Sequence, residues 1–83
     1  MPKITIYTTR TCPFCKMEKD YLTSKNVLFT EIFVDEKPEE AQKMIDISGQ
    51  MGVPFTVIDD DNGKRVTILG FDKAKLEETL DLS

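Results

Sequence analysis

The 83-residue sequence contains no histidine and no tryptophan, and it has only two cysteines. Without imidazole groups the chain cannot use histidine for acid–base catalysis, and it lacks a ligand found in most zinc sites. No apolar run approaches the roughly 18 residues that a membrane-spanning helix needs. The N-terminus, MPKITIYTT, alternates in polarity and so does not resemble the apolar segment of a signal peptide. We therefore expect a cytoplasmic protein with no membrane partner.

The chain also lacks the basic surplus of a nucleic-acid-binding protein, because its formal net charge is −4. The charge is unevenly distributed. Residues 1–27 carry five basic and two acidic residues, whereas the remainder carries six basic and thirteen acidic residues. Both cysteines lie in the basic segment, where positive potential favours a thiolate and attracts anionic substrates. The alternative interpretation is that these charges only solvate a helix and a strand.

The sequence does contain a regular alternation of strand-like and helix-like segments. Stretches rich in β-branched residues predict strands at residues 3–9, 27–35, 54–59 and 64–69, with a hairpin at DDNG before the last. Helices are predicted from Pro13 to about residue 25, from Pro38 to Gly49, and after Asp72 as an N-cap. The residues at helical spacing are Phe14, Met17, Tyr21 and Leu22 in the first helix and Ala74, Leu76 and Leu80 in the last. The order β-α-β-α-β-β-α predicts one α/β domain over residues 1–83, a four-stranded mixed sheet flanked by three helices.

The two cysteines lie three residues apart in the stretch TCPFC, residues 11–15. Two cysteines placed at random in a chain of this length have this spacing about 2% of the time. A structural disulfide would close a very small loop and constrain the unfolded chain little. Zinc needs four ligands, so a second chain would have to complete a site with two thiols. The spacing after a strand is instead typical of a redox-active dithiol.

The two cysteines are not equivalent in the predicted helix. Cys12 falls at the N-cap, where unpaired backbone N–H groups and the helix dipole stabilise a thiolate and lower the pKa of the thiol. Cys15 lies one turn further on the same side, within reach of a mixed disulfide at Cys12. We therefore expect Cys12 to be the nucleophile and Cys15 the resolving thiol.

Three segments make the chain resemble the glutaredoxin family over essentially its whole length, and most of all small bacterial glutaredoxin-like proteins of the YruB type. CPFC is one residue from the family's Cys-Pro-Tyr-Cys, SGQMGVP at residues 48–54 is similar to a segment ending in Thr-Val-Pro, and LGFDK at residues 69–73 is similar to a Gly-Gly-x-Asp element. The resemblance implies a thioredoxin fold with a cis bond between Val53 and Pro54. It also implies a glutathione-dependent oxidoreductase that reduces protein disulfides and glutathione mixed disulfides, with no tightly bound cofactor. We further expect a monomer that binds no metal.

The resemblance further implies where glutathione binds. Val53, held by Pro54, would pair with the cysteinyl backbone of glutathione. Phe71 and Asp72, at the start of the last helix, would hold the γ-glutamyl end, and Asp72 would also cap that helix. Gln50 would contact the glycyl carboxylate.

Two further residues near the cysteines complete the implied site. Arg10 would replace a lysine that many glutaredoxins have three residues before the first cysteine, where this chain has Thr9. Phe14 stands in the place of the motif's tyrosine and would line the cleft.

Two other functions remain open from the sequence. Thr9 and Leu69 depart from the glutaredoxin pattern and favour a glutaredoxin-like protein that is recharged by a thioredoxin reductase. A carrier that holds an iron–sulfur cluster between two protomers is the third hypothesis. Pro13 argues against it, because related carriers usually have a smaller residue there.

Overall fold

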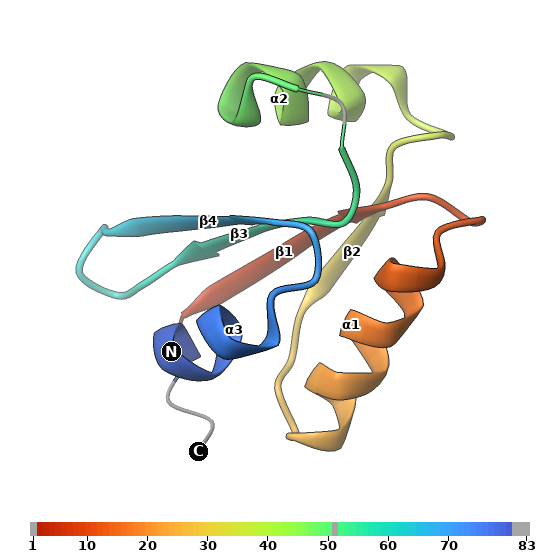
Figure 1. The fold of residues 1–83 in the computed structure, drawn as a ribbon. Coiled ribbons are helices and arrows are strands. Elements are labelled where there is room, and N and C mark those ends of the chain that lie inside the picture. Colours follow the sequence, from red (N-terminus) through yellow and green to blue (C-terminus); the bar gives the residue numbers. More distant parts are fainter. Residues whose placement is uncertain (1, 51, 81–83) are drawn as a thin grey trace.

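A computed structural model describes residues 2–50 and 52–80 of the chain (Figure 1). The elements follow one another as β1 (Lys3–Thr8), α1 (Pro13–Ser24), β2 (Thr30–Phe33), α2 (Pro38–Ser48), β3 (Phe55–Asp59), β4 (Arg65–Leu69) and α3 (Lys73–Leu80). This order confirms the predicted β-α-β-α-β-β-α arrangement. Met51, in the middle of the SGQMGVP segment, lies outside the described residues.

The strands form one mixed sheet in the order β2-β1-β3-β4. β1 runs parallel to β2, with Tyr7 opposite Ile32, because helix α1 carries the chain back across the sheet between them. β3 is antiparallel to both β1 and β4, and the tight turn at residues 60–64 joins β3 directly to β4. As a result, the C-terminal end of β1 and the start of β3 lie at the same end of the sheet.

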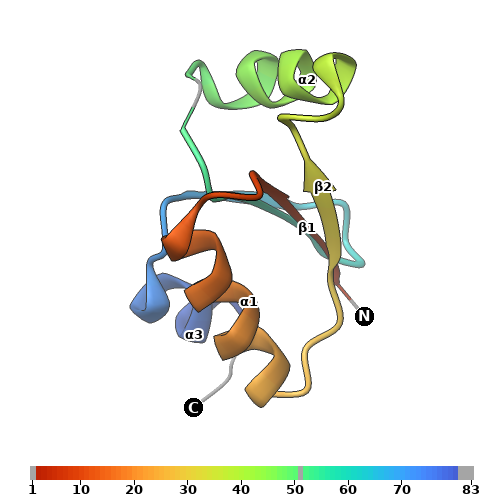
Figure 2. The ribbon, with the colours of Figure 1, turned by 90° about the vertical axis from the view of Figure 1, so that its right-hand side faces the viewer.

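Helices cover both faces of this sheet, so the protein has three layers. Helix α2 lies on one face, and α1 and α3 lie side by side on the other (Figures 1 and 2). Because side chains alternate along each strand, the sheet contributes to a separate apolar cluster on each face. The cluster on the α1 and α3 face comprises Ile4, Ile6, Leu22, Ile58, Ile68 and Leu76, and the cluster under α2 comprises Tyr7, Met44, Phe55 and Val57.

Strand β2 is shorter than predicted. Of the nine residues 27–35, only Thr30–Phe33 pair with β1. Val27 and Phe29 pack against the core from an irregular segment, and the Glu36 amide donates to the Phe33 carbonyl to close a turn after the strand. Val27 and Phe29 therefore pack against the core rather than pair in a strand, whereas Leu28 between them is exposed.

The buried faces of two helices also differ from the expected stripes. In α1 the buried residues are Cys15, Glu18 and Leu22, whereas Phe14 and Met17 point outward and are 60% and 51% exposed. In α3, Leu76 is buried and Ala74 is exposed, because two residues correspond to about 200° around a helix. None of the helices within the described ranges is both long and apolar enough to cross a membrane.

Candidate active site

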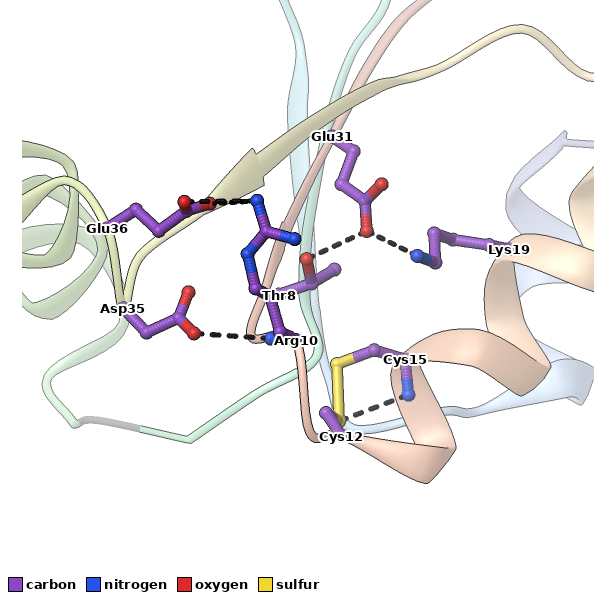
Figure 3. A network of polar contacts seen from close by, with 8 residues as sticks. All are labelled: Thr8, Arg10, Cys12, Cys15, Lys19, Glu31, Asp35 and Glu36. Atoms are coloured by element: carbon purple, nitrogen blue, oxygen red, sulfur yellow. Dashed lines mark hydrogen bonds and ion pairs between the residues drawn. A yellow bond between two sulfur atoms is a disulfide. The ribbon is translucent and has the colours of Figure 1, made fainter.

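The N-terminus of α1 places the two cysteines together. Cys12 is the N-cap, with extended backbone angles, and Pro13 follows at the first helical position. A disulfide joins Cys12 to Cys15, whose Cα atoms are 5.2 Å apart, and the Cys15 amide donates a hydrogen bond to the Cys12 sulfur at 3.1 Å (Figure 3). An amide at a helix N-terminus that already points at Cys12 Sγ will favour negative charge on that sulfur when the disulfide opens.

The two sulfurs differ in their access to a reaction partner. Cys15 is 1% exposed and lies against the sheet, whereas Cys12 is half-buried and lines an open cavity of about 380 Å³. A thiol or disulfide from another molecule can therefore approach Cys12 but not Cys15. This difference in burial agrees with the expected roles of nucleophile for Cys12 and resolving thiol for Cys15.

The bond between Val53 and Pro54 is cis, as the family resemblance predicted. Pro54 is buried, and its carbonyl accepts a hydrogen bond of 2.8 Å from the amide of Gly70. This bond ties the segment before β3 to the turn that precedes α3. The structure thus brings two of the three family-like segments, the one ending in Val53-Pro54 and the one with Gly70-Phe71-Asp72, side by side.

Asp72 caps helix α3, because its Oδ1 accepts a hydrogen bond of 3.1 Å from the Lys75 amide. The neighbouring Phe71 turns its ring toward the core, where the ring lies 6.0 Å from that of Tyr21. The Phe71 ring therefore belongs to the packing around Tyr21, and the Phe71 backbone lies just before α3.

Arg10 lies beside Cys12, but its guanidinium is already engaged (Figure 3). It pairs with Glu36 at 3.0 Å and lies 5.0 Å above the Phe33 ring, and the Arg10 amide bonds to Asp35 at 3.3 Å. Arg10 therefore lines the same cavity as Cys12 while its charge is balanced by Glu36.

Of the expected glutathione contacts within the described residues, Arg10 alone lines the cavity that Cys12 opens into, and the last two to be placed, Gln50 and Phe14, lie apart from it. Gln50 is exposed just after helix α2, and its backbone makes two hydrogen bonds with the Ser48 hydroxyl. Phe14 presents an exposed ring on the outer side of α1.

A polar network that was not predicted from the sequence borders the cavity on the side of β2. Thr8 donates to the Glu31 carboxylate at 2.9 Å, and Lys19 of α1 pairs with the same oxygen at 2.6 Å (Figure 3). These contacts link the end of β1 with β2 and α1. They hold Lys19 at the cavity that Cys12 and Lys16 also line.

Glu18 is a second residue that the sequence reasoning missed. Its side chain is fully buried beneath α1, and the Thr56 hydroxyl donates to its Oε2 at 2.5 Å. Burial raises the pKa of the Glu18 carboxyl, and the hydrogen bond from Thr56 opposes that shift. The spacing 15, 18, 22 along α1 was the available signal, since it places Glu18 on the same face as Cys15 and the core residue Leu22.

No group of three or more metal-binding side chains gathers anywhere in residues 2–50 and 52–80. Asp59 and Asp60, at the hairpin between β3 and β4, make local contacts. Asp59 pairs with Arg65, and Asp60 Oδ1 accepts hydrogen bonds from the amides of Asn62 and Lys64.

Comparisons with known proteins agree with this geometry. The family model described as Glutaredoxin matches residues 4–62. An uncharacterized glutaredoxin-like 8.6 kDa protein in the rubredoxin operon of Clostridium pasteurianum is 40% identical, over 94% of this chain and 97% of its own length. Glutaredoxin 3 of Escherichia coli is 41% identical over 71% of both chains. The crystal structure of a glutaredoxin from Archaeoglobus fulgidus superposes with a TM-score of 0.80 at 30% identity, over 96% of this chain and 87% of the other.

Proposed function

Because the chain belongs to the glutaredoxin family and is a thiol–disulfide oxidoreductase, we propose that glutathione is its electron donor and that Cys12 and Cys15 act as nucleophile and resolving thiol. Its substrates would be protein disulfides and glutathione mixed disulfides. The observation that supports the two cysteine roles is their unequal burial, with Cys12 accessible at the N-terminus of α1 and Cys15 buried beneath it.

The reaction begins with the reduced pair. The Cys12 thiolate attacks one sulfur of a substrate disulfide, and the other substrate sulfur leaves as a thiolate that takes a proton from solvent. Cys15 then attacks Cys12 Sγ, which forms the Cys12–Cys15 disulfide and releases the second substrate thiol. The substrate gains two electrons, and the protein is left in the oxidised state that the structure contains.

Two molecules of glutathione complete the cycle. The first attacks Cys12, forms a mixed disulfide and frees Cys15; the second attacks the glutathione sulfur and leaves as glutathione disulfide. The hydrogen bond between Pro54 and Gly70 supports this assignment, because it joins the segment at Val53, just before β3, to the turn at Gly70 that leads to Asp72 and α3. An extended tripeptide could pair with the first and place its amino-acid end at the second.

The direct test compares two electron donors for reduction of a small disulfide substrate. We expect turnover with glutathione, glutathione reductase and NADPH to exceed turnover with thioredoxin reductase and NADPH by at least about tenfold, equivalent to roughly 1.4 kcal/mol. Each coupled system would be calibrated with a glutaredoxin or thioredoxin of known activity. Faster turnover with thioredoxin reductase would contradict glutathione dependence and leave the dithiol chemistry intact.

The role of Asp72 can be separated from its role as a helix cap. Asparagine caps a helix as well as aspartate does, so Asp72→Asn should leave the free energy of unfolding nearly unchanged. It removes the negative charge proposed to hold the ammonium group of glutathione, and we expect the KM for glutathione to rise about tenfold. Asp72→Ala is the matched variant, which should lose both the binding and about 1 kcal/mol of stability. An unchanged KM in Asp72→Asn would show that Asp72 is only a cap.

A second donor is favoured by one observation. The guanidinium of Arg10, the residue expected to replace the family's lysine, is paired with Glu36. A site with this cation already balanced offers less attraction to a glutathione carboxylate. Recharging by a thioredoxin reductase is therefore the alternative function, and the comparison of donors decides between the two.

A further inference from the structure

Glu18 occupies a buried position where a carboxyl group without a function would only destabilise the fold. Its side chain is fully buried, one carboxylate oxygen accepts the Thr56 hydrogen bond, and the other, Oε1, has no hydrogen-bond partner among the described residues. A buried carboxylate with an unbonded oxygen destabilises the fold, whereas an apolar side chain of similar size would pack there without that penalty. The position therefore points to a role for the carboxyl group itself.

The neighbouring Cys15 lacks an obvious acceptor for its proton. Its thiol must ionise before it can attack the mixed disulfide at Cys12, yet it is 1% exposed and has little access to water. The chain contains no histidine to act as a base. Glu18 follows Cys15 by three residues on the same buried face of α1, a spacing that brings side chains within about 5–6 Å at their Cβ atoms.

We propose that Glu18 accepts the proton of the Cys15 thiol when Cys15 attacks the mixed disulfide at Cys12, and returns it to Cys15 when the Cys12–Cys15 disulfide is reduced. The inference rests on the proposed roles of the two cysteines.

In the closing step a proton moves from Cys15 Sγ to Glu18, a sulfur–sulfur bond forms between Cys15 and Cys12, and the bond from Cys12 to the substrate sulfur breaks. The departing substrate thiolate is protonated by solvent. In the reverse step a donor thiolate attacks Cys12, the intramolecular disulfide breaks, and the Cys15 thiolate takes the proton from Glu18.

The surroundings of Glu18 suit this exchange. Burial raises the pKa of its carboxyl toward that of a thiol, which brings the two groups closer in proton affinity and favours transfer in both directions. On the side of β3, the Glu18 carboxyl contacts Thr56, which is uncharged. The charged groups of the adjoining elements have other partners: Glu31 of β2 is paired with Lys19 and bonded by Thr8 of β1, and Glu77 of α3 is bonded by Tyr21.

The test isolates the step made by Cys15. Reduced protein is mixed with bis(2-hydroxyethyl) disulfide, a neutral probe that needs no glutathione site, and samples are acid-quenched so that the mixed disulfide at Cys12 and the closed disulfide can be counted by mass. Glu18→Gln keeps an acceptor oxygen for Thr56 and removes the proton-accepting group. We expect closure in this variant to slow about 10²-fold at pH 7. The deficit should shrink as the pH rises beyond about 8.5, the ordinary pKa of a thiol, because burial raises the pKa of a cysteine and more thiolate then forms without help from Glu18.

The same reaction contains its controls. Formation of the mixed disulfide at Cys12 reports the integrity of the fold, and an equal slowing of both steps in Glu18→Gln would overturn the proposal in favour of a structural role. Glu77→Gln removes another carboxylate next to α1 that accepts a hydrogen bond from a hydroxyl group. This variant should form the Cys12–Cys15 disulfide as fast as the unmodified protein. An identical pH profile in Glu18→Gln and the unmodified protein would also overturn the role of Glu18. If the unmodified protein forms no mixed disulfide at Cys12, that result contradicts the assigned roles of the two cysteines rather than the role of Glu18.

Discussion

A Cys12→Ser variant is expected to lose reduction of every disulfide substrate, by at least about 10³-fold. A serine hydroxyl does not ionise near neutral pH and cannot form a disulfide with a substrate. Cys15 cannot take over, because it is 1% exposed and lies behind Cys12 on the inner face of α1. The measurement is the rate of reduction of a glutathionylated peptide and of a protein disulfide, each coupled to NADPH oxidation.

The matched Cys15→Ser variant should separate the two substrates. It keeps the nucleophile and should still remove glutathione from the peptide, because a second glutathione can resolve the mixed disulfide at Cys12. It should lose most reduction of the protein disulfide, where an intramolecular attack by Cys15 is needed to release the substrate. Retention of both activities in Cys12→Ser, or loss of both in Cys15→Ser, would contradict the assigned roles.

The architecture could be predicted from the sequence because each element carries its own local signal. Pro13 and Pro38 stand at the first positions of α1 and α2, and Gly49 ends α2 in the left-handed conformation with φ of 78°. Asp72 caps α3 as expected. The cis bond before Pro54 has no local signal, and only the family resemblance predicted it.

The errors have a common physical origin, which is that burial depends on contacts between distant segments. Phe14 and Met17 have helical spacing and are apolar, yet the face of α1 that meets the sheet passes through Cys15, Glu18 and Leu22. Apolar spacing alone does not identify this face, because the face includes a charged residue and charged residues are rarely buried. Glu18 is the exception, because it is charged yet buried, and it lies one turn from Cys15 on the same face of α1.

The surroundings of Cys12 were less predictable than the cysteines themselves. The sequence places Arg10 two residues before Cys12, but it does not show that Glu36 of a distant turn would bind the guanidinium. Nor does it show that Lys19 and Glu31, twelve residues apart, would pair beside the cavity. Such partners are set by the β2–β1 pairing and the docking of α1, so the preference for a donor depends on tertiary structure more than on the motif.

The stability of α1 on the sheet is expected to depend strongly on Leu22. Its side chain is fully buried in the cluster that also contains Ile6 and Leu76. Leu22→Ala should lower the free energy of unfolding by about 2–5 kcal/mol, through lost apolar contact and the cavity that remains. For a domain of this size, each kcal/mol lowers the melting temperature by about 4–8 °C. Urea and thermal unfolding of the oxidised protein, followed by circular dichroism, would measure both quantities.

Leu28→Ala is the control, because it makes the same chemical change at a side chain that is 86% exposed in the segment before β2. The free energy of unfolding should change by no more than about 0.5 kcal/mol, since an exposed leucine gives up little contact when truncated. The difference between the two variants isolates the contribution of the interface between α1 and the sheet, which holds Cys15 and Glu18 in place. Similar losses at both positions would mean that Leu28 is covered in solution or that Leu22 is not, and either result would contradict the placement of α1.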